Sequence, residues 1–353
     1  MGEAYFRRKI MDWSASYNRA MPWKGEKNPY LIWLSEIILQ QTRVEQGLPY
    51  FLTFKKKFPT VFDLAKAPLD DILLAWEGLG YYSRARNLHA TAKNIVENYG
   101  GNFPNTYDEI IKLKGIGAYT AAAISSFAFD EPRAVVDGNV IRVLSRFKNE
   151  ATPYDTTLGR KVFQQLADQF LDEKNPAKYN QAIMDFGAII CTPNNPQCGT
   201  CVVAKKCESF TKKNVESLPK RLKKISIKKR FFIYFILKKD NKIAICKRAE
   251  KDIWQDLYQF PMVELAEEFE LKHIIEVAKK KLGYAIKGDF VGSDSQLLSH
   301  QKINCFFVNI ENSSAFEKKN KEQANWIWVD ERELQKFAMP KIINLFVKKN
   351  SVI

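Results

Sequence analysis

The sequence predicts an all-α module over about residues 1–210, followed by an α+β domain over residues 230–353. Three observations predict this arrangement. The chain has 353 residues, which is enough for two domains. Its first part carries helix-capping signals, and its last part carries short runs of β-branched and aromatic residues. Between them, residues 211–229 are strongly basic, contain Pro219 and lack regular hydrophobic spacing, which predicts a linker.

Helix signals follow one another through the first part of the chain. Residues 67–78 have a proline near the start, acids in the first turn and a glycine at the end, and Thr106–Glu109 form a capping-box pattern. Further helical runs are expected at 33–44, 119–129, 139–147, 157–171 and 180–190. In the last part, strands are expected at 231–237, 242–246, 303–310 and 326–329, and helices at 268–281 and 341–348.

Composition narrows the class of protein. Hydrophobic residues make up 46% and charged residues 27%, as is typical of globular proteins. The N-terminus lacks the apolar region of a signal peptide, and no apolar run approaches the roughly 18–20 residues that span a membrane. We therefore expect the protein to stay in the compartment where it is made, with no membrane partner. The net charge of +15 favours nucleic acid, although a basic surface kept for solubility would give the same charge.

Four of the six cysteines are crowded into one short segment. These are Cys191, Cys198, Cys201 and Cys207, whereas the other two stand alone. A disulfide framework would distribute its pairs along the chain, so the cluster indicates a metal site in a reducing compartment. The spacing by itself leaves a zinc ion and a [4Fe–4S] cluster equally open, because four thiolates serve both.

A glycine-rich turn is followed about twenty residues later by a carboxylate. Leu113-Lys-Gly115-Ile-Gly117 lies between two helical runs, and its glycines allow the backbone to approach a ligand closely. The N–H groups that open the next helix then offer a phosphate site. Asp137 directly precedes Gly138 and another helix, so it is either an N-cap or a functional carboxylate. The two roles are compatible, because a helix N-terminus favours the ionised form.

Glu36 is a second candidate acid. It lies in the helical run at 33–44, where Trp33, Ile37 and Gln40 share its face. Burial would raise the pKa of this carboxyl group and suit it to donate a proton. The alternative is an ordinary glutamate at the solvent-facing edge of a helix.

Together these motifs resemble the helix-hairpin-helix glycosylases of the endonuclease III superfamily. The hairpin with its downstream Asp137 matches, and so does the cysteine spacing, which implies a [4Fe–4S] cluster. Trp33-x-Ser-Glu36-x-x-Leu-Gln-Gln-Thr42-x-Val is similar to the signature of MutY-type adenine DNA glycosylases. This resemblance implies that Glu36 protonates the adenine leaving group. It also implies that Asp137 stabilises the oxocarbenium ion or forms a transient adduct with the sugar.

The resemblance extends to residues that would support the reaction. Tyr119 and Asn139 would orient the two acids and the water. Lyase-competent relatives carry a lysine at the position of Tyr119, so the tyrosine implies a monofunctional glycosylase. Lys112 and Lys114 are close in sequence and leave a trace of lyase activity open.

Other matching residues would contact DNA or the flipped base. Tyr81, in Gly78-Leu-Gly-Tyr-Tyr, would wedge into the duplex, although helix-end packing is its alternative role. The remaining contacts would come from Gln41, Thr42, Gly115 and Gly117, and the adenine pocket would be lined by Arg19, Met21 and Trp23.

The last part of the chain resembles a Nudix-like fold around Cys246–Pro261. Val277, Lys280 and Lys281 stand where Nudix hydrolases carry metal-binding acids, so pyrophosphatase activity is not expected. The resemblance implies that Ser299 and His300 recognise 8-oxoguanine, with a leucine at 298 in place of the family's phenylalanine. An ordinary surface residue is the alternative for His300.

The resemblance therefore implies excision of adenine opposite 8-oxoguanine or guanine in double-stranded DNA, as part of base-excision repair. It also implies a monomeric cytoplasmic protein, associated with the nucleoid in a bacterium. A six-helix part at about 25–135 and an iron–sulfur part at 1–24 and 136–210 would form the catalytic module. The main alternative is a bifunctional glycosylase and AP lyase of the endonuclease III type. A DNA-binding module without catalysis and a nucleotide pyrophosphatase are further alternatives.

Overall fold

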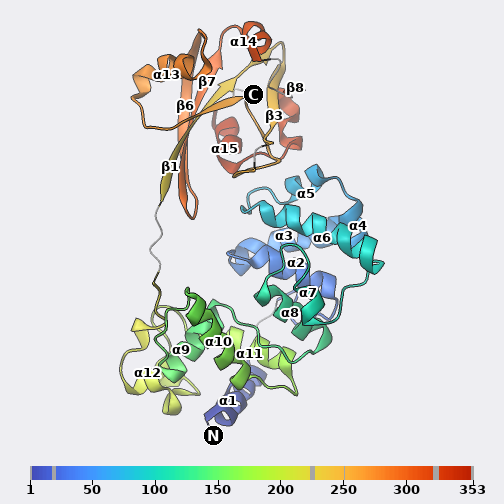
Figure 1. The fold of residues 1–353 in the computed structure, drawn as a ribbon, viewed down its shortest axis with the longest axis vertical. Helices are drawn as coiled ribbons and strands as arrows, with labels where there is room; N and C mark the ends of the chain where they lie inside the picture. Colours follow the sequence, from blue (N-terminus) through green and yellow to red (C-terminus); the bar gives the residue numbers. More distant parts are fainter. Residues whose placement is uncertain (1, 18–20, 223–226, 250, 321–325, 351–353) are drawn as a thin grey trace. The chain divides into compact units, whose positions relative to one another are not determined.

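The computed structural model describes residues 2–17, 21–222, 227–249, 251–320 and 326–350 (Figure 1). The chain forms two compact units. The helical unit comprises residues 1–66 and 87–224, and the C-terminal unit comprises residues 67–86 and 225–353. This grouping differs from the division expected from the sequence in two respects. Residues 67–86 group with the C-terminal residues, and residues 211–224 of the expected linker group with the helical unit.

The helical unit is built entirely from helices and connecting turns in its described residues. Its α-helices are α1 (Gly2–Ser16), α2 (Pro29–Leu39), α3 (Val44–Lys57), α4 (Val61–Lys66), most of α6 (Ser83–Tyr99), α7 (Tyr107–Ile110), α8 (Ala118–Phe129), α9 (Gly138–Lys148), α10 (Thr157–Phe170), α11 (Pro176–Ile189) and α12 (Glu208–Thr211). The helices expected at 119–129, 139–147 and 157–171 are confirmed to within about one residue at each end. Their caps and apolar spacing are local signals, which explains the agreement.

The helical run expected at 33–44 is wrong beyond Leu39. The chain leaves α2 there, turns at Gln40–Arg43, and re-enters a helix at Val44. Gln41 adopts a φ of +55° in this turn. The turn contains neither glycine nor proline, and apolar residues continue on both sides of it. Apolar spacing therefore could not detect the break.

One hydrophobic core lies where α1, α9, α10 and α11 meet. Phe6, Phe147 and Phe170 pack against one another with ring centroids 4.5 to 5.8 Å apart, and all three are buried. Burial of aromatic side chains of this size is a large stabilising contribution. The core fixes α9 relative to α11, and Asp137 stands at the N-terminus of α9.

The C-terminal unit contains two sheets (Figure 1). The first has the order β5-β1-β7-β6, and the second has the order β2-β3-β4 with β8 paired to β3. The strands are β1 (Lys228–Ile236), β2 (Lys238–Lys239), β3 (Lys242–Lys247), β4 (Tyr258–Gln259), β5 (Met262–Leu265), β6 (Gly288–Leu297), β7 (Gln301–Ile310) and β8 (Trp326–Asp330). The α-helices are α5 (Leu69–Ala75), α13 (Ile274–Leu282), α14 (Ser313–Asn320) and α15 (Lys341–Asn350). This is the α+β fold expected, with all four expected strands present.

Strand β6 was not expected from the sequence. Its residues Gly288–Leu297 include two glycines, two aspartates and two serines, which have low strand propensity. Pairing with β7 forms the strand nevertheless, with an irregularity between Phe290 and Gly292. The hairpin between β6 and β7 carries Ser299 and His300 at its tip.

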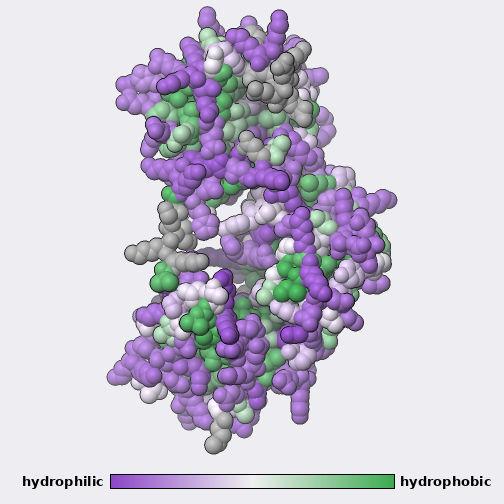
Figure 2. All heavy atoms as spheres, viewed as in Figure 1, coloured by the Kyte–Doolittle hydropathy of each residue, from purple (hydrophilic) through white to green (hydrophobic). Residues whose placement is uncertain are grey.

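The surface is mostly hydrophilic on the face that Figure 2 shows, with scattered hydrophobic residues. Within the described residues, no helix combines the length and apolarity needed to cross a membrane. The basic segment is attached to the helical unit as far as Leu222. Its Lys220 carbonyl accepts from the Tyr154 amide at 3.1 Å, and the Leu222 amide donates to Asp155 at 2.9 Å.

Candidate active site

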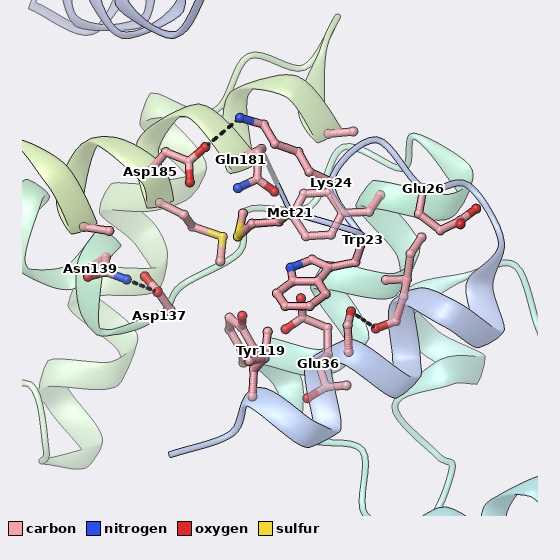
Figure 3. A pocket seen from close by; sticks show the side chains of 18 of the residues that line it. Met21, Trp23, Lys24, Glu26, Glu36, Tyr119, Asp137, Asn139, Gln181 and Asp185 are labelled. Carbon is pink, nitrogen blue, oxygen red and sulfur yellow. Dashed lines mark hydrogen bonds and ion pairs between the residues drawn. The ribbon is translucent and has the colours of Figure 1, made fainter. Parts of the chain in front are cut away.

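A cavity of about 1390 Å³ opens within the helical unit. Its walls come from the turn at 21–27, from α2 and the turn after it, from the start of α8, from residues 136–139 and from α11. Figure 3 shows Glu36, Tyr119, Asp137 and Asn139 around it, together with Met21 and Trp23. Residues far apart in the sequence, which were proposed as one site, therefore do meet in one cavity.

Glu36 is buried in the wall that α2 forms. The helix begins after Asn28, whose side chain caps it, and every residue from Tyr30 to Ile38 is buried. Glu36 itself is 9% exposed, which excludes the alternative of a solvent-facing glutamate. Burial raises its pKa to about 7, the nearby charge of Asp137 also raises it, and a hydrogen bond from Tyr119 opposes the shift.

Tyr119 lies in the first turn of α8 and is directed at the same carboxyl group. Its hydroxyl is hydrogen-bonded to Glu36. Burial and the charges of Glu36 and Asp137 hold the pKa of this phenol well above its usual value, so it remains a proton donor. The side chain thus fixes the position of the Glu36 carboxyl group.

Asp137 is the N-cap of α9. One carboxylate oxygen accepts from the Val140 amide at 2.7 Å, and the other accepts from the Asn139 side chain at 2.7 Å. The capping role expected from the sequence is confirmed, and the same carboxylate lines the cavity. Burial raises its pKa, whereas the hydrogen bonds from Val140 and Asn139 favour the charged form.

Asn139 is held in place by an arginine that the sequence analysis did not single out. The Arg142 guanidinium donates to Asn139 Oδ1 at 2.7 Å, to the Gly187 carbonyl at 2.7 Å and to the Cys191 carbonyl at 2.7 Å. Arg142 follows Asn139 by three residues, so helical spacing could have suggested the first contact. The other two contacts join segments more than forty residues apart and left no local signal.

The residues expected at the adenine pocket were Arg19, Met21 and Trp23, and Gln41 and Thr42 were expected to contact DNA. Met21, Trp23, Gln41 and Thr42 line the cavity, and the Trp23 ring packs edge-on against Phe51. Arg19 lies outside the described residues. Lys24, Gln181 and Asp185 also line the cavity, although the sequence did not indicate them.

The glycine-rich turn has the backbone geometry that its sequence suggested. Gly115 has a φ of +78°, and an added Cβ atom would lie 2.6 Å from Asn87 Cβ, so no other residue fits without displacement. Gly117 is the N-cap of α8 and lines the cavity. Lys112 and Lys114 are exposed and lie outside the cavity lining.

The expected lesion-contact residues of the C-terminal unit lie together. Ser299 and His300 are exposed at the tip of the β6–β7 hairpin, and the Ser299 hydroxyl is hydrogen-bonded to that of Tyr81. Tyr81 is 44% exposed and has a φ of +50°. Its exposure makes helix-end packing a poor account of this side chain.

The four clustered cysteines surround a second, smaller cavity of about 30 Å³ in the helical unit. Arg146 donates to Cys191 Sγ at 3.5 Å, and Cys207 Sγ donates to the Arg146 carbonyl at 3.4 Å. In the part of the chain that the structure describes, no three His, Cys, Asp or Glu side chains are arranged around a single ion. All four thiols are free and line one cavity, and four cysteines are the ligand set that iron–sulfur clusters use.

Comparison with family models places two domains along the chain. Residues 34–166 match the HhH-GPD superfamily of base excision DNA repair proteins, and residues 233–349 match the NUDIX domain. The first match includes Glu36, Tyr119, Asp137 and Asn139, whereas residues 21–27 and α11, which also line the cavity, lie outside it.

Two relatives illustrate the similarity to characterised proteins. The adenine DNA glycosylase of Buchnera aphidicola subsp. Baizongia pistaciae is 35% identical over 98% of this chain and 96% of its own length. The human adenine DNA glycosylase is 38% identical over 60% of this chain and 41% of its own length.

Among solved structures, a thermostable thymine-DNA glycosylase matches with a TM-score of 0.56 and 29% identity. The match covers 60% of this chain and 97% of that one. A non-covalent endonuclease III–DNA complex matches with a TM-score of 0.52 and 22% identity, over 60% of this chain and 97% of that one. The second likeness supports the fold of the helical unit.

Proposed function

Because the chain belongs to the adenine DNA glycosylase family, we propose that it removes adenine paired with 8-oxoguanine or guanine in double-stranded DNA. The observation that carries the proposal is the buried Glu36 carboxyl group, whose pKa is raised to about 7 in a cavity shared with Asp137. A carboxylic acid that keeps its proton near neutral pH can protonate a base as it leaves. Glu36 is therefore the proposed general acid.

Asp137 is the proposed partner at the sugar. As the C1′–N bond breaks, positive charge develops on the sugar ring, and a carboxylate beside it stabilises the oxocarbenium ion or forms a transient adduct. The hydrogen bonds from Val140 and Asn139 favour the charged carboxylate that this role needs. Asn139 and Tyr119 are the proposed positioning residues for Asp137 and Glu36 respectively.

The proposed reaction ends with hydrolysis and leaves the DNA strand intact. A lyase would need an amine that attacks C1′ of the sugar. Tyr119 occupies the position at which lyase-competent relatives carry lysine, and its hydroxyl is engaged by Glu36. Lys24 and Lys27 line the cavity and are paired with aspartates at 3.1 and 2.7 Å, and a third lining lysine, Lys178, is exposed on α11. These observations support a monofunctional enzyme.

Recognition of the mispair is proposed to use two sets of residues. Met21 and Trp23, with Arg19, would enclose the flipped adenine. Gln41 would fill the space that adenine leaves in the stack, and Tyr81 would wedge beside the damaged guanine. Both Gln41 and Tyr81 hold positive φ angles of +55° and +50°. Such conformations cost about 1–3 kcal/mol in residues other than glycine and are concentrated at functional sites.

The base opposite adenine is proposed to be read by Ser299 and His300 at the β6–β7 hairpin, with Thr42, Gly115 and Gly117 contacting DNA elsewhere. In this proposal the module at 1–210 carries the chemistry. The domain at 230–353, joined by the basic segment at 211–229, reads the lesion. The net charge of +15 suits binding of the phosphate backbone.

We further propose that Cys191, Cys198, Cys201 and Cys207 hold a [4Fe–4S] cluster, which would cross-link the segment between them. Burial raises the pKa of Cys201 to about 11, so this thiol needs a bound cation to become a thiolate ligand. Cys201→Ala should lower the iron and sulfide content of the purified protein. Cys305→Ala, which changes a cysteine of the C-terminal sheet, is the control and should leave both unchanged.

The activity is tested by single-turnover cleavage of a duplex with one adenine opposite 8-oxoguanine, with and without alkali. Strand breaks that appear only after alkali support a monofunctional adenine glycosylase. Breaks without alkali, trapped as a covalent adduct by borohydride, would indicate the endonuclease III type of lyase instead. An absence of abasic product under both conditions would leave only DNA binding.

A further inference from the structure

An ion pair joins two walls of the large cavity. Lys24 Nζ donates to Asp185 Oδ2 at 3.1 Å, and these residues are 161 positions apart in the sequence. The Asp185 side chain is 4% exposed and that of Lys24 is 21% exposed. Figure 3 shows the pair beside Met21 and Trp23, which lie between it and Glu36. Both members of the pair line the cavity themselves.

The aspartate belongs to a firmly held element. Asp185 lies in α11, where the neighbouring Phe186 is part of the hydrophobic core. The Gly187 carbonyl accepts from Arg142, and an added Cβ atom on Gly187 would lie 2.7 Å from Asn139 Cβ. Helix α11 is thus packed directly against the segment that carries Asp137 and Asn139. A lysine bound to Asp185 is tied to the wall that holds the proposed catalytic carboxylate.

The lysine belongs to a short turn. The Lys24 amide donates to the Met21 carbonyl at 3.0 Å, and Gly25 follows with a φ of +79°. Trp23 is half-buried and contacts Phe51. The hydrogen bond between Lys24 and Asp185 is charge-assisted and largely removed from water, so the pair has a defined geometry. The pair therefore restricts the position of Met21 and Trp23.

We propose that the Lys24–Asp185 ion pair fastens the turn at 21–25 to α11, and that Lys24 is a positioning residue for adenine excision. The turn supplies Met21 and Trp23 to the wall that faces Glu36, so fastening it sets where a base can lie relative to the acid. The inference rests on the proposed function for its kinetic part. Its structural part, the fastening of the turn, stands independently.

The chain offers a matched control just after this turn. Lys27 Nζ donates to Asp130 Oδ2 at 2.7 Å, and both residues line the same cavity. Their side chains are 55% and 60% exposed, and exposed pairs of this kind contribute little to stability. Lys27→Gln removes the same charge from the same wall as Lys24→Gln. If the lysines acted only by attracting DNA through their positive charge, both variants should therefore lose the same amount of activity.

The kinetic test measures single-turnover adenine excision at saturating enzyme, together with the dissociation constant for the duplex. A displacement of about 1 Å can slow a reaction by up to about 100-fold. We expect Lys24→Gln and Asp185→Asn to slow excision about 10- to 100-fold, with DNA affinity changed less than about threefold. Lys24→Arg should restore most of the rate, and the double variant should be no slower than the slower single variant.

Three kinetic results would overturn the proposal. They are a Lys24→Gln rate within twofold of the unmodified protein, equal losses in Lys24→Gln and Lys27→Gln, or additive losses in the double variant. Thermal unfolding of each variant shows whether it is folded. If Lys24→Gln did not fold, the excision rates of Lys24→Arg, which keeps the ion pair, and Asp185→Asn, which removes it, would be compared instead.

Amide hydrogen–deuterium exchange separates this inference from the proposed function. The segment Met21–Lys27 should exchange faster in Lys24→Gln than in Lys27→Gln, whether or not the protein excises adenine. Unchanged exchange in Lys24→Gln would refute the fastening. The two proposals can also fail separately. If the unmodified protein did not excise adenine but the amides of Lys24→Gln exchanged faster, the proposed function would be refuted and the fastening of the turn would be supported.

Discussion

The two carboxyl groups of the cavity are held in opposite ways. Glu36 lies in the interior of α2, where backbone amides are used by the helix itself, and its hydrogen bond comes from a side chain, Tyr119. Asp137 lies at the N-terminus of α9, where the Val140 amide is free to donate to it. Burial raises the pKa of both groups, but backbone donors counter the shift only at Asp137.

The comparison shows that position along a helix distinguishes two similar side chains. A carboxyl group inside an apolar helix has little to stabilise its charge, so it keeps its proton to about pH 7 at Glu36. A carboxyl group at a helix N-terminus meets unpaired N–H groups and the positive end of the helix dipole. One cavity thus contains a group suited to give a proton and another suited to carry a charge.

Removing the proton of Glu36 should have the largest effect. Glu36→Gln keeps the size of the side chain, and we expect single-turnover adenine excision to fall about 100- to 10,000-fold, the usual contribution of a general acid. Binding of the duplex should be nearly unchanged. Glu26→Gln is the control, because Glu26 lines the same cavity but accepts from the Lys27 and Asn28 amides. A Glu36→Gln enzyme with full rate would remove Glu36 from the mechanism.

Substituting the second carboxyl group should separate capping from catalysis. Asparagine is as good an N-cap as aspartate, so Asp137→Asn should change the free energy of unfolding by less than about 1 kcal/mol. The charge beside the sugar is lost, and we expect excision to slow by about 100-fold. Urea unfolding and single-turnover kinetics measure the two quantities. If the rate were unaffected, Asp137 would be a helix cap only.

The capping role of Asp137 could be predicted from the sequence, whereas the burial of Glu36 could not. Asp137, Gly138 and the helix after them are neighbours in the chain, and capping is a local interaction, so its pattern is visible in the sequence. The burial of Glu36 was not visible in this way. Every side chain from Tyr30 to Ile38 is buried, so α2 has no polar face from which the position of Glu36 could be judged.

Long-range contacts account for what the sequence could not predict in the site. Lys24 meets Asp185 and Arg142 meets Cys191 because the fold brings distant segments together. Each of these residues looks like an ordinary polar residue in its own segment. Strand β6 is a similar case, since pairing with β7 outweighs the low strand propensity of its glycines, aspartates and serines.

The smallest expected effect is a pH dependence that belongs to Glu36. The acid form is needed for proton donation, and its pKa is about 7. Between pH 7 and pH 8 the protonated fraction of such a group falls about fivefold, so the single-turnover rate should fall by about the same factor. A rate that stays constant across this range would mean that Glu36 does not supply the proton.

Stability provides an independent check on the same proton. The folded pKa of Glu36, about 7, lies above its ordinary value of 4.5, so the bound proton favours the folded state. This contribution is complete below about pH 4.5, is lost as the pH rises through about 7, and amounts to a few kcal/mol, about 3 at most. Relative to Glu36→Gln, the free energy of unfolding should therefore decrease over that window. If the free energy of unfolding changed with pH in the same way in both proteins, Glu36 would be ionised in the folded state. Glu36 and Asp137 would then no longer differ in their charge.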